Sequence, residues 1–562
     1  MSDQRNRGCS VSDQGTRGDL RWGTVPALLR AVAREHGDAE AVVDRSVDPT
    51  ARLSFAELDE HADAMAAAMI AEGVHPGDRV AIWAPNCWEW VVALMGLQRA
   101  GAVLVPLNTR YKGAEAAEIL RRSRAKVLFT VQGFLGNDYV SMLRDATPGG
   151  AALEHLEHLV LLRDTGSVPE GVLTMPRLLA AGRAEHRDEA RRRESMLRPD
   201  DTSDLLFTSG TTGHPKGVVM THGQSLRAFA DWADIVGLRA GDRYLCINPF
   251  FHTFGYKAGI LASLMSGATL VPLATFDLDE VVDTIEAERI SMIPGPPTIY
   301  QALLNHPGVT PERTGSLRLA VTGAAAVPVE LVERMRDELG FETVVTAYGL
   351  TESCGIATVC RHDDDPWTIA TTSGRAIPGV EVEILDDAGT ILPPEQPGEV
   401  VVRGYTVMRG YFEAPEQTAE VIDGAGWLHT GDIGVLDERG YLRITDRKKD
   451  MFIVGGFNAY PAEIERVLLT RPEVAQAAVV GVPDDRLGEV GHAFVVPAVG
   501  EQVDVVALGE FARRELANFK VPRSIEVVDA LPLNASGKVL KYELRQRAMD
   551  ENGPDGPTGG TT

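Results

Sequence analysis

Short apolar runs alternate along most of the chain with amphipathic stretches of helical length. The apolar runs, which predict strands, include 79–85, 102–107, 126–131, 243–249 and 268–274. The amphipathic stretches, which predict helices, include 87–101, 112–123 and 278–290. Strands that alternate with helices are typical of α/β layers built on mostly parallel sheets. The highly charged stretch 183–195 predicts a solvated helix or linker.

The pattern changes near 441–457, after which the predicted elements become smaller. We expect helices over 461–470, 505–516 and 541–549, and strands over 475–484, 492–499 and 523–532. These elements predict a small mobile α+β domain, with the basic segment 446–450 as its hinge. The expected units are a disordered tail over 1–21, a large α/β domain of layered sheets and helices over 22–446, the small C-terminal domain over 447–546, and a second tail over 547–562.

Composition and charge narrow the possible functions. The 562 residues include 55 Lys and Arg against 80 Asp and Glu, which gives a net charge of −25. Such a surface repels nucleic acid and anionic membranes, so a general nucleic-acid binder is disfavoured. The five cysteines form no C-x-x-C pair and no zinc spacing, which indicates a reduced, cytoplasmic protein. We expect no secretory signal and no stable membrane insertion, because the apolar stretch 91–107 is interrupted by Gln98 and Arg99.

The segment 204–217, DLLFTSGTTGHPKG, carries the strongest chemical pattern. An apolar strand runs into small hydroxylated residues and glycines, whose backbone N–H groups can turn toward an anion without obstruction. The candidate phosphate-binding residues are Thr208, Ser209, Gly210, Thr211, Thr212, Gly213 and Lys216. The loop is not a Walker motif, because Gly217 follows Lys216 where that motif needs Ser or Thr. The alternative interpretation is a flexible Ser/Gly turn.

On this loop, and on further motifs in the same order, the chain resembles the adenylate-forming superfamily of acyl-CoA synthetases, amino-acid adenylation domains and beetle luciferases. The resemblance covers roughly residues 22–546. It implies that a carboxylate attacks the α-phosphorus of ATP in the presence of Mg²⁺, and that pyrophosphate leaves. The thiol of coenzyme A then takes the acyl group from the adenylate. Catalysis would be positioning and charge neutralisation, without a covalent enzyme nucleophile.

Further motifs carry the nucleotide contacts that the resemblance implies. In TAYGLTE, 346–352, Tyr348 would stack on adenine, Thr351 would contact the α-phosphate, and Glu352 would hold Mg²⁺ together with phosphate oxygens. The implied ATP-binding residues beyond the first loop are Gly323, Ala324, Tyr348, Gly349, Asp432 and Arg447. Asp432 would accept both ribose hydroxyls, and Arg447 would reach the ribose and phosphates. Taken singly, these short patterns also fit tight packing, an exposed strand end or a solvated charge.

The resemblance places the catalytic lysine and the moving parts in the C-terminal domain. Lys538 of PLNASGK would swing in for the first half-reaction and bridge the carboxylate and the α-phosphate oxygens. Its spacing also resembles a lysine-acetylation site, so a lysine acetyltransferase acting on Lys538 is an expected partner. Lys449 occupies the hinge position. In the second pose the coenzyme A tunnel would be lined by Gly455, Gly456 and Phe457, whose alternative interpretation is a strand-to-helix turn before Pro461.

The acyl site would be formed by NPFFHTFGYKAG, 248–259, with nearby apolar residues. The expected pocket residues are Phe251, Tyr256, Ile299, Tyr300 and Ile356. His252 would border the acyl site and the thiol route, although a histidine between aromatic residues also fits a packed core. Lys257 could donate to a ring oxygen of the substrate, and the favoured alternative is a lysine on a surface helix. Amino-acid adenylation is disfavoured, because no acidic residue stands here to hold an α-ammonium.

These stretches, with AVTGAA and NFKVPRS, resemble one subgroup, the actinobacterial CoA ligases for the steroid C/D-ring remnant, a methylhydrindanone propanoate. The expected partners are therefore a bulky apolar carboxylic acid, ATP and coenzyme A. A medium- or long-chain fatty acyl-CoA synthetase is the alternative. From other classes, a luciferase-like oxygenase or a loader of carrier proteins shares the same motifs. A dead binding module is disfavoured, because Thr208, Glu352, Asp432, Arg447 and Lys538 are all present.

Overall fold

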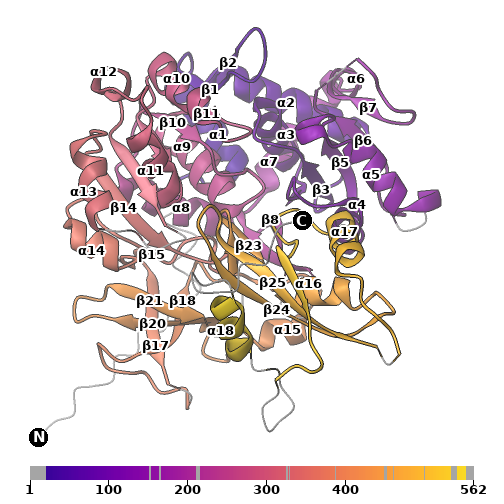
Figure 1. Cartoon of the computed structure of the whole chain (residues 1–562). Helices are drawn as coiled ribbons and strands as arrows, with labels where there is room; N and C mark the ends of the chain where they lie inside the picture. Colours follow the sequence, from indigo (N-terminus) through magenta and orange to yellow (C-terminus); the bar gives the residue numbers. More distant parts are fainter. Residues whose placement is uncertain are drawn as a thin grey trace, which may run out of the picture.

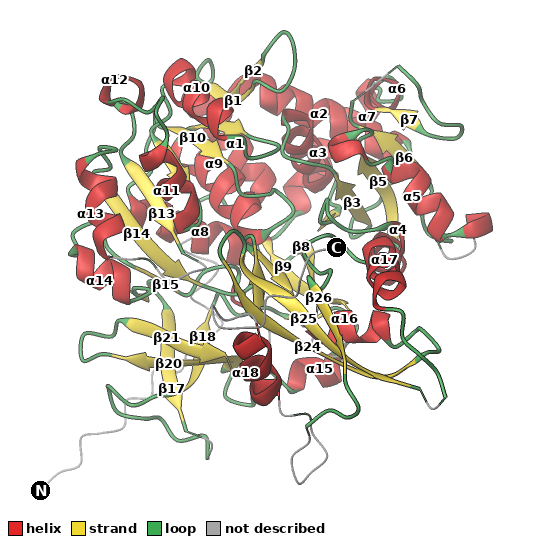
Figure 2. Cartoon of the chain, viewed as in Figure 1, coloured by secondary structure: helices red, strands yellow, loops and turns green. Residues whose placement is uncertain are grey.

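The computed structural model describes residues 21–551, apart from 151–152, 164–165, 210–214, 324–326, 328, 387, 448–451, 460, 499, 533–538 and 540. Within these residues the strands form two large sheets and two small ones, with helices packed around them (Figures 1 and 2). The α/β fold class predicted from the alternating pattern is confirmed.

The two large sheets make up the N-terminal part of the chain. The described strands of the first run in the order β19 (Gly410–Tyr411), β9 (Pro215–Thr221), β8 (Thr202–Ser209), β4 (Val103–Pro106), β3 (Arg79–Trp83), β5 (Ala125–Thr130), β6 (His158–Leu161) and β7 (Leu173–Thr174). Those of the second run in the order β16 (Arg375–Ala376), β15 (Thr358–Val359), β14 (Thr343–Tyr348), β13 (Leu319–Thr322), β12 (Met292–Pro294), β10 (Arg243–Cys246), β11 (Thr269–Pro272), β1 (Glu40–Asp44) and β2 (Ala51–Ser54). Their central strands pair in parallel, as the sequence predicts.

A layer of helices separates and covers these sheets. The helices of this part are α1 (Val25–His36), α2 (Phe55–Ala71), α3 (Trp88–Arg99), α4 (Gly113–Ser123), α5 (Tyr139–Ala146), α6 (Met175–Leu179), α7 (Ala184–Met196), α8 (His222–Val236), the π-helix η3 (Phe254–Leu261), α9 (Ala262–Ser266), α10 (Leu278–Glu288), α11 (Pro297–Asn305), α12 (Pro311–Thr314), α13 (Val329–Asp337) and α14 (Pro366–Thr371). Helix α3 contacts β4 of one sheet and β1 of the other. It is buried on all sides, as expected for a helix between two layers.

The remaining elements form two smaller units. One sheet holds β17 (Val380–Leu385), β18 (Gly398–Gly404), β20 (Leu428–Leu436) and β21 (Leu442–Arg447), with α15 (Pro415–Ala419) nearby in the chain. The other holds β23 (Phe457–Ala459), β22 (Phe452–Val454), β25 (Gly488–Pro497), β24 (Val474–Asp484) and β26 (Ser524–Val527), with α16 (Pro461–Leu468), α17 (Val505–Glu515) and α18 (Lys541–Glu551). This last unit has its own apolar core, which begins at Phe452. The boundary at 446/447 stays a prediction.

The turn between β22 and β23 differs from the alternative considered for it. Val454 pairs with Phe457 across a two-residue hairpin, so the glycines do not join a strand to a helix. Both Gly455 and Gly456 have positive φ, of 56° and 84°. Two successive positive φ values are what a tight hairpin of this length requires, which explains the glycine pair. Helix α16 begins only at Pro461.

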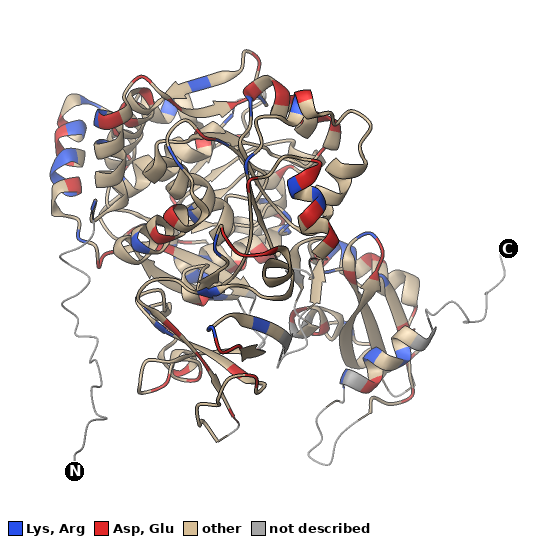
Figure 3. Cartoon of the chain, turned by 90° about the vertical axis from the view of Figure 1, so that its left-hand side faces the viewer, with Lys and Arg blue, Asp and Glu red and all other residues tan. Residues whose placement is uncertain are grey.

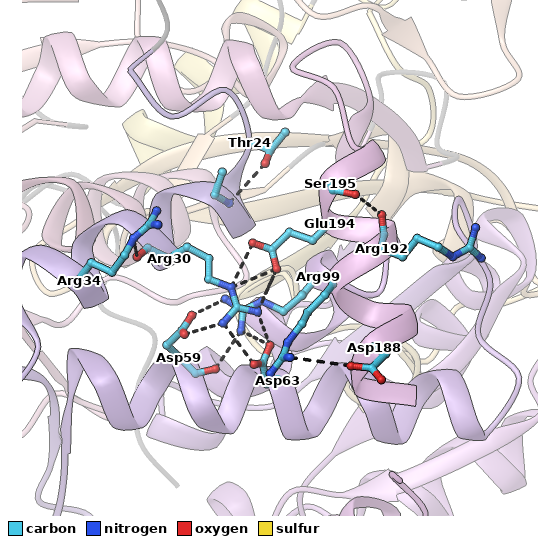
Figure 4. A network of polar contacts seen from close by, with 12 residues as sticks. Thr24, Arg30, Arg34, Asp59, Asp63, Arg99, Asp188, Arg192, Glu194 and Ser195 are labelled. Atoms are coloured by element: carbon cyan, nitrogen blue, oxygen red, sulfur yellow. Dashed lines mark hydrogen bonds and ion pairs between the residues drawn. The ribbon is translucent and has the colours of Figure 1, made fainter. Parts of the chain in front are cut away.

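The charged stretch predicted as a solvated helix or linker is helix α7, and one side of it is not solvated. Its Glu194 lies 3.2 Å from both Arg30 and Arg99. The same two arginines pair with Asp59 and Asp63 of α2 at 2.5–2.8 Å. Figure 4 shows the two guanidinium groups converging between these carboxylates. Because Arg99 is fully buried, this network of two arginines and three carboxylates joins α1, α2, α3 and α7.

The outer surface carries both signs of charge. In the view of Figure 3, basic and acidic positions are interspersed along the helices and do not separate into a basic face. No helix of the described residues is both long and apolar enough to span a bilayer.

Replacement of Arg99 with Met tests the buried network. Asp59, Asp63 and Glu194 would then share Arg30 alone, and breaking a buried ion pair costs about 3–5 kcal/mol. We expect a clearly lower unfolding temperature in calorimetry. Arg191→Met is the matched control, since Arg191 pairs with Asp188 on the exposed side of α7. Its effect should stay within about 0.5 kcal/mol. Equal unfolding temperatures for both variants would contradict the role of the network.

Candidate active site

The predicted phosphate loop joins β8 to β9 as an antiparallel hairpin. Thr208 pairs with Lys216, and Ser209 with Pro215, so the hairpin sets the first hydroxyl beside the lysine. Lys216 is 7% exposed. Phe207 packs on Gly217, where a Cβ atom would lie 3.0 Å from the Phe207 ring. The described part of the loop therefore has a rigid base. Gly210, Thr211, Thr212 and Gly213 lie outside the described residues, as does the side chain of Ser209.

Glu352 faces this hairpin from the short 3₁₀ helix η4 (Thr351–Ser353), which follows β14. Its Oε1 atom accepts a hydrogen bond of 2.8 Å from the hydroxyl of Tyr411. The Tyr411 ring in turn lies 4.9 Å from the Lys216 ammonium. Burial raises the pKa of Glu352, although Tyr411 and Lys216 both favour the ionised carboxylate. Tyr411 was not predicted, and no pattern in its local sequence marks it.

The turn between β14 and η4 explains the glycine of TAYGLTE. A Cβ atom on Gly349 would lie 2.4 Å from the backbone nitrogen of Ile356 and 2.5 Å from Gly355. Only glycine fits where two stretches of backbone approach this closely. Thr351 is half-buried on the same turn, next to Glu352. Gly323 follows β13, the strand beside β14, while Ala324 lies outside the described residues.

Tyr348 and Asp432 meet although 84 positions separate them. The hydroxyl of Tyr348 donates a 2.6 Å hydrogen bond to Oδ2 of Asp432, which is 3% exposed in β20. In the neighbouring strand β21, Arg447 is the register partner of Asp432. The side chain of Arg447 lies outside the described residues. The structure thus brings together the Tyr, the Asp and the backbone of the Arg that were selected as nucleotide ligands.

The expected acyl-site residues divide into core residues and more accessible ones. Tyr256 is fully buried, and Gln98 donates to its hydroxyl at 3.0 Å. Tyr300 is also fully buried, and its hydroxyl donates to the Ile293 carbonyl at 2.9 Å. Ile299 is 7% exposed, Ile356 is 1% exposed, and Phe251 is half-buried. The two tyrosine hydroxyls therefore already have partners within the protein.

The His252 side chain is accessible to solvent, although the surrounding protein still lowers its pKa by desolvation, so it is not a closely packed core residue. Its Nδ1 atom accepts from the backbone N–H of Phe254 at 3.3 Å, at the start of η3. Within η3, a Cβ atom on Gly255 would lie 2.1 Å from the Pro249 carbonyl oxygen. The glycine therefore lets the π-helix fold back against the turn that carries His252.

Lys257 is not on the surface, which corrects the favoured alternative for it. It is fully buried in η3, and its ammonium lies 3.2 Å from Oδ1 of Asp204 and 3.6 Å from the Cys354 sulfur. Asp204 is fully buried in β8. Its charge raises the pKa of Lys257 although burial acts to lower it. The lysine thus joins η3 to the strand that leads into the phosphate loop. Asp204 was missed, because a strand position inside an apolar run indicates packing.

The predicted C-terminal site residues are only partly described. Gly455 and Gly456 are exposed at the β22–β23 turn, and the ring of Phe457 stacks on Phe519 at 4.9 Å. Lys449 and Lys538 both lie outside the described residues.

Two family models match the chain. Residues 29–412 match the AMP-binding enzyme family, and residues 463–538 match the AMP-binding enzyme C-terminal domain.

Two curated relatives carry the same name, 3-[(3aS,4S,7aS)-7a-methyl-1,5-dioxo-octahydro-1H-inden-4-yl]propanoyl:CoA ligase. The chain is 52% identical to that of Mycobacterium tuberculosis over 531 residues, which cover 94% of this chain and 99% of the relative. It is 50% identical to that of Rhodococcus jostii strain RHA1 over 528 residues, which cover 93% of this chain and 98% of the relative.

Two solved structures resemble the fold to different degrees. A double mutant of o-succinylbenzoate CoA synthetase (MenE) from Bacillus subtilis, bound to the product analogue OSB-NCoA, has a TM-score of 0.77 at 30% identity, covering 92% of this chain and 98% of that one. ATP-bound MatB from Rhodopseudomonas palustris has a TM-score of 0.66 at 29% identity, covering 93% and 99%. The chain therefore belongs to the AMP-binding enzyme family and is an AMP-forming acyl-CoA ligase.

Proposed function

We propose that this ligase joins coenzyme A to a bulky fused-ring acid of the methylhydrindanone propanoate class. The observation that carries the proposal is the identity of 50–52% over nearly the whole chain to two ligases named for that acid. The half-buried Phe251 and the buried Ile299 and Ile356 suit an apolar ring system.

The proposed reaction has two balanced steps. A carboxylate oxygen of the acid bonds to the α-phosphorus of ATP while the bond to pyrophosphate breaks. The sulfur of coenzyme A then bonds to the acyl carbon while the bond to AMP breaks, and its thiol proton passes to solvent. Both steps build negative charge on phosphate oxygens, so the enzyme contributes by placing donors and cations there.

The residues selected from the sequence would share this work, although residues 210–213 and Ala324 lie outside the described part. Thr208, Ser209 and Lys216, with residues 210–213, would bind phosphate oxygens at the hairpin. Tyr348 would stack on adenine while keeping its hydrogen bond to Asp432, and Asp432 would accept the ribose hydroxyls. Gly323, Ala324 and Gly349 would admit the nucleotide close to backbone. His252, exposed at the start of η3, would border the thiol route.

The residues present fit a magnesium ion that arrives with ATP. Mg²⁺ is usually held by one or two carboxylates, with phosphates and water completing its shell. Glu352 offers such a carboxylate, oriented by Tyr411 through one oxygen. Among the described residues no group of three or more His, Cys, Asp or Glu forms a protein-only metal site. When bound, Mg²⁺ would offset the phosphate charge.

A panel of acids tests the substrate class. We expect the fused-ring propanoate to give AMP and a thioester of the matching mass at a higher kcat/KM than octanoate or palmitate. The measurement is AMP release together with mass spectrometry, with ATP, Mg²⁺ and coenzyme A present. Higher kcat/KM for the straight-chain acids would support the fatty acyl-CoA alternative. Oxygen uptake or light with the same acids would indicate an oxygenase.

Tyr411→Phe tests the proposed metal role of Glu352. Loss of a hydrogen bond that orients a ligating carboxylate typically costs about 10–100-fold in metal affinity. We expect the Mg²⁺ concentration for half-maximal ATP–pyrophosphate exchange to rise about tenfold. Tyr405→Phe is the matched control, since it removes a similar 2.7 Å bond to Asp231 outside the site. A Mg²⁺ dependence of Tyr411→Phe equal to that of Tyr405→Phe would contradict the role of the Tyr411 hydrogen bond in orienting Glu352 for the metal.

Lys538→Ala tests whether Lys538 of the PLNASGK motif acts in the adenylation step. We expect ATP–pyrophosphate exchange to fall by at least about 100-fold, the usual cost of losing one donor to a developing charge. Thioester formation from supplied acyl-adenylate should persist, because that step forms no bond at the α-phosphorus. If both half-reactions fell equally, Lys538 would not be specific to adenylation. Acetylated enzyme that still forms adenylate would rule out control by acetylation.

A further inference from the structure

One buried lysine connects the C-terminal unit to the large N-terminal part. Lys520 follows α17 and is 2% exposed. Its ammonium donates to Oε1 of Glu463 in α16 at 2.6 Å and to Oε1 of Glu115 in α4 at 2.8 Å. The ring of Tyr111, just before α4, lies 4.6 Å from the same ammonium.

Separation of the two domains would affect the carboxylates of Glu463 and Glu115 differently. Glu463 belongs to the same unit as Lys520, so that pair would move as one body. Glu115 belongs to the N-terminal part and would become solvated. Its second oxygen accepts from the backbone N–H of Lys112 at 2.8 Å, which keeps the side chain oriented at the start of α4. Glu115 is therefore positioned to accept Lys520 again whenever the unit returns.

The rest of the boundary does not resemble a permanent interface. The apolar core of the C-terminal unit is separate from the large core. Among the described elements, no helix or strand of one part packs along an element of the other. Interfaces with little apolar packing allow domain motion. Between described side chains, the ion pair from Lys520 to Glu115 is the one that crosses the boundary.

The comparison with solved structures concerns the arrangement of the two parts of the chain in which the ion pair between Lys520 and Glu115 forms. The TM-score is 0.77 against the complex with a CoA product analogue and 0.66 against the ATP complex, at nearly equal identity and coverage. Taken over the whole chain, the structure thus superposes more closely on the CoA-product complex than on the ATP complex.

We propose that Glu115 and Lys520 form a cross-domain latch that holds the C-terminal unit in the arrangement for thioester formation and opens for adenylation. The proposal rests on the two-step function proposed above. Lys520 is a positioning residue, since it touches no reacting atom. Glu463 keeps the ammonium in place on its own side. Opening exchanges one buried ion pair for solvated charges, which allows the latch to be reversible.

Three variants separate the cross-domain contact from a merely structural one. Glu115→Gln removes the charge but keeps an acceptor for the Lys112 backbone. Lys520→Glu sets its new carboxylate against Glu115. The exchange Glu115→Lys with Lys520→Glu restores attraction across the boundary with the same total charge. Glu118→Gln is the control, because Glu118 lies one turn further on α4 and pairs only within that helix, with Arg121.

The two half-reactions are measured separately, as ATP–pyrophosphate exchange and as thioester formation from supplied acyl-adenylate. We expect Glu115→Gln to slow thioester formation about tenfold, a coupling of the size usual between linked sites, with exchange unchanged or faster. Lys520→Glu should slow it further, and the exchanged pair should recover part of the loss, because the new carboxylate still lies against Glu463. Equal changes in both half-reactions, or no change in either, would overturn the latch.

A distance measurement keeps the latch testable apart from the proposed function. Spin labels on Asp145→Cys of α5 and Arg513→Cys of α17, both exposed, report the separation of the two parts. We expect the short-distance population to fall in Lys520→Glu and to return in the exchanged pair. If no acid gave a thioester with the unmodified enzyme, the proposed function would fail while this distance test still stood. Identical distance distributions in all variants would overturn the latch alone.

Discussion

The described part of the active site depends on the pairing of the short strand β19 with β9. Tyr411 pairs with Val218 and Gly410 with Val219, and Phe412 donates to the Gly217 carbonyl at 2.7 Å. This pairing places the Tyr411 ring over Lys216 and its hydroxyl on Glu352. Strand β9 also pairs with β8. The paired strands therefore hold the β8–β9 hairpin, the Lys216 ammonium and the Glu352 carboxylate in a defined arrangement. The same backbone bonds therefore stabilise the sheet edge and arrange the charges that would face ATP.

Buried cations in the described part of the protein are paired with carboxylates, whereas the whole chain carries an excess of acidic residues. Arg99 is surrounded by three carboxylates, and Lys257 lies against Asp204 in the helix layer. An isolated buried charge is costly, so the buried cations Arg99, Lys257 and Lys520 each lie within hydrogen-bonding reach of a carboxylate. The net charge of −25 consequently describes mainly the solvated surface. In the proposed function, Lys216 would offset this acidity locally and so help to accommodate anionic substrates.

Buried ions serve two different purposes in this fold. The Arg99 network and the Lys257–Asp204 pair join elements that surround one core. Lys520 instead connects two cores, and an ion pair suits that position because its members are stable in water when apart. A large apolar contact at the same place would hold the small unit in one arrangement. A ligase that performs two reactions on one acyl group benefits from a contact that can open.

The sequence by itself determined the α/β layers, the small C-terminal unit, the strand-fed phosphate loop and the nucleotide-ligand candidates. These features depend on local period, on turn residues and on short motifs, which are all properties of neighbouring positions. The hydrogen bond between Tyr348 and Asp432 agrees with the nucleotide contacts that the motifs imply for both residues, although the sequence alone does not show how far apart they lie.

Only the tertiary structure decided which side chains meet from distant segments. Tyr411 reaches Glu352 from 59 positions away, and Lys520 reaches Glu115 across 405. Lys257 was expected in solvent and is instead buried against Asp204, because its π-helix lies between the two sheets rather than on the surface. Such pairs leave no periodic trace in the chain, since their attraction depends on low local dielectric and on a geometry fixed by tertiary packing. The sequence therefore identifies the candidate reaction chemistry, and the tertiary packing decides which charged side chains position the groups that carry it out.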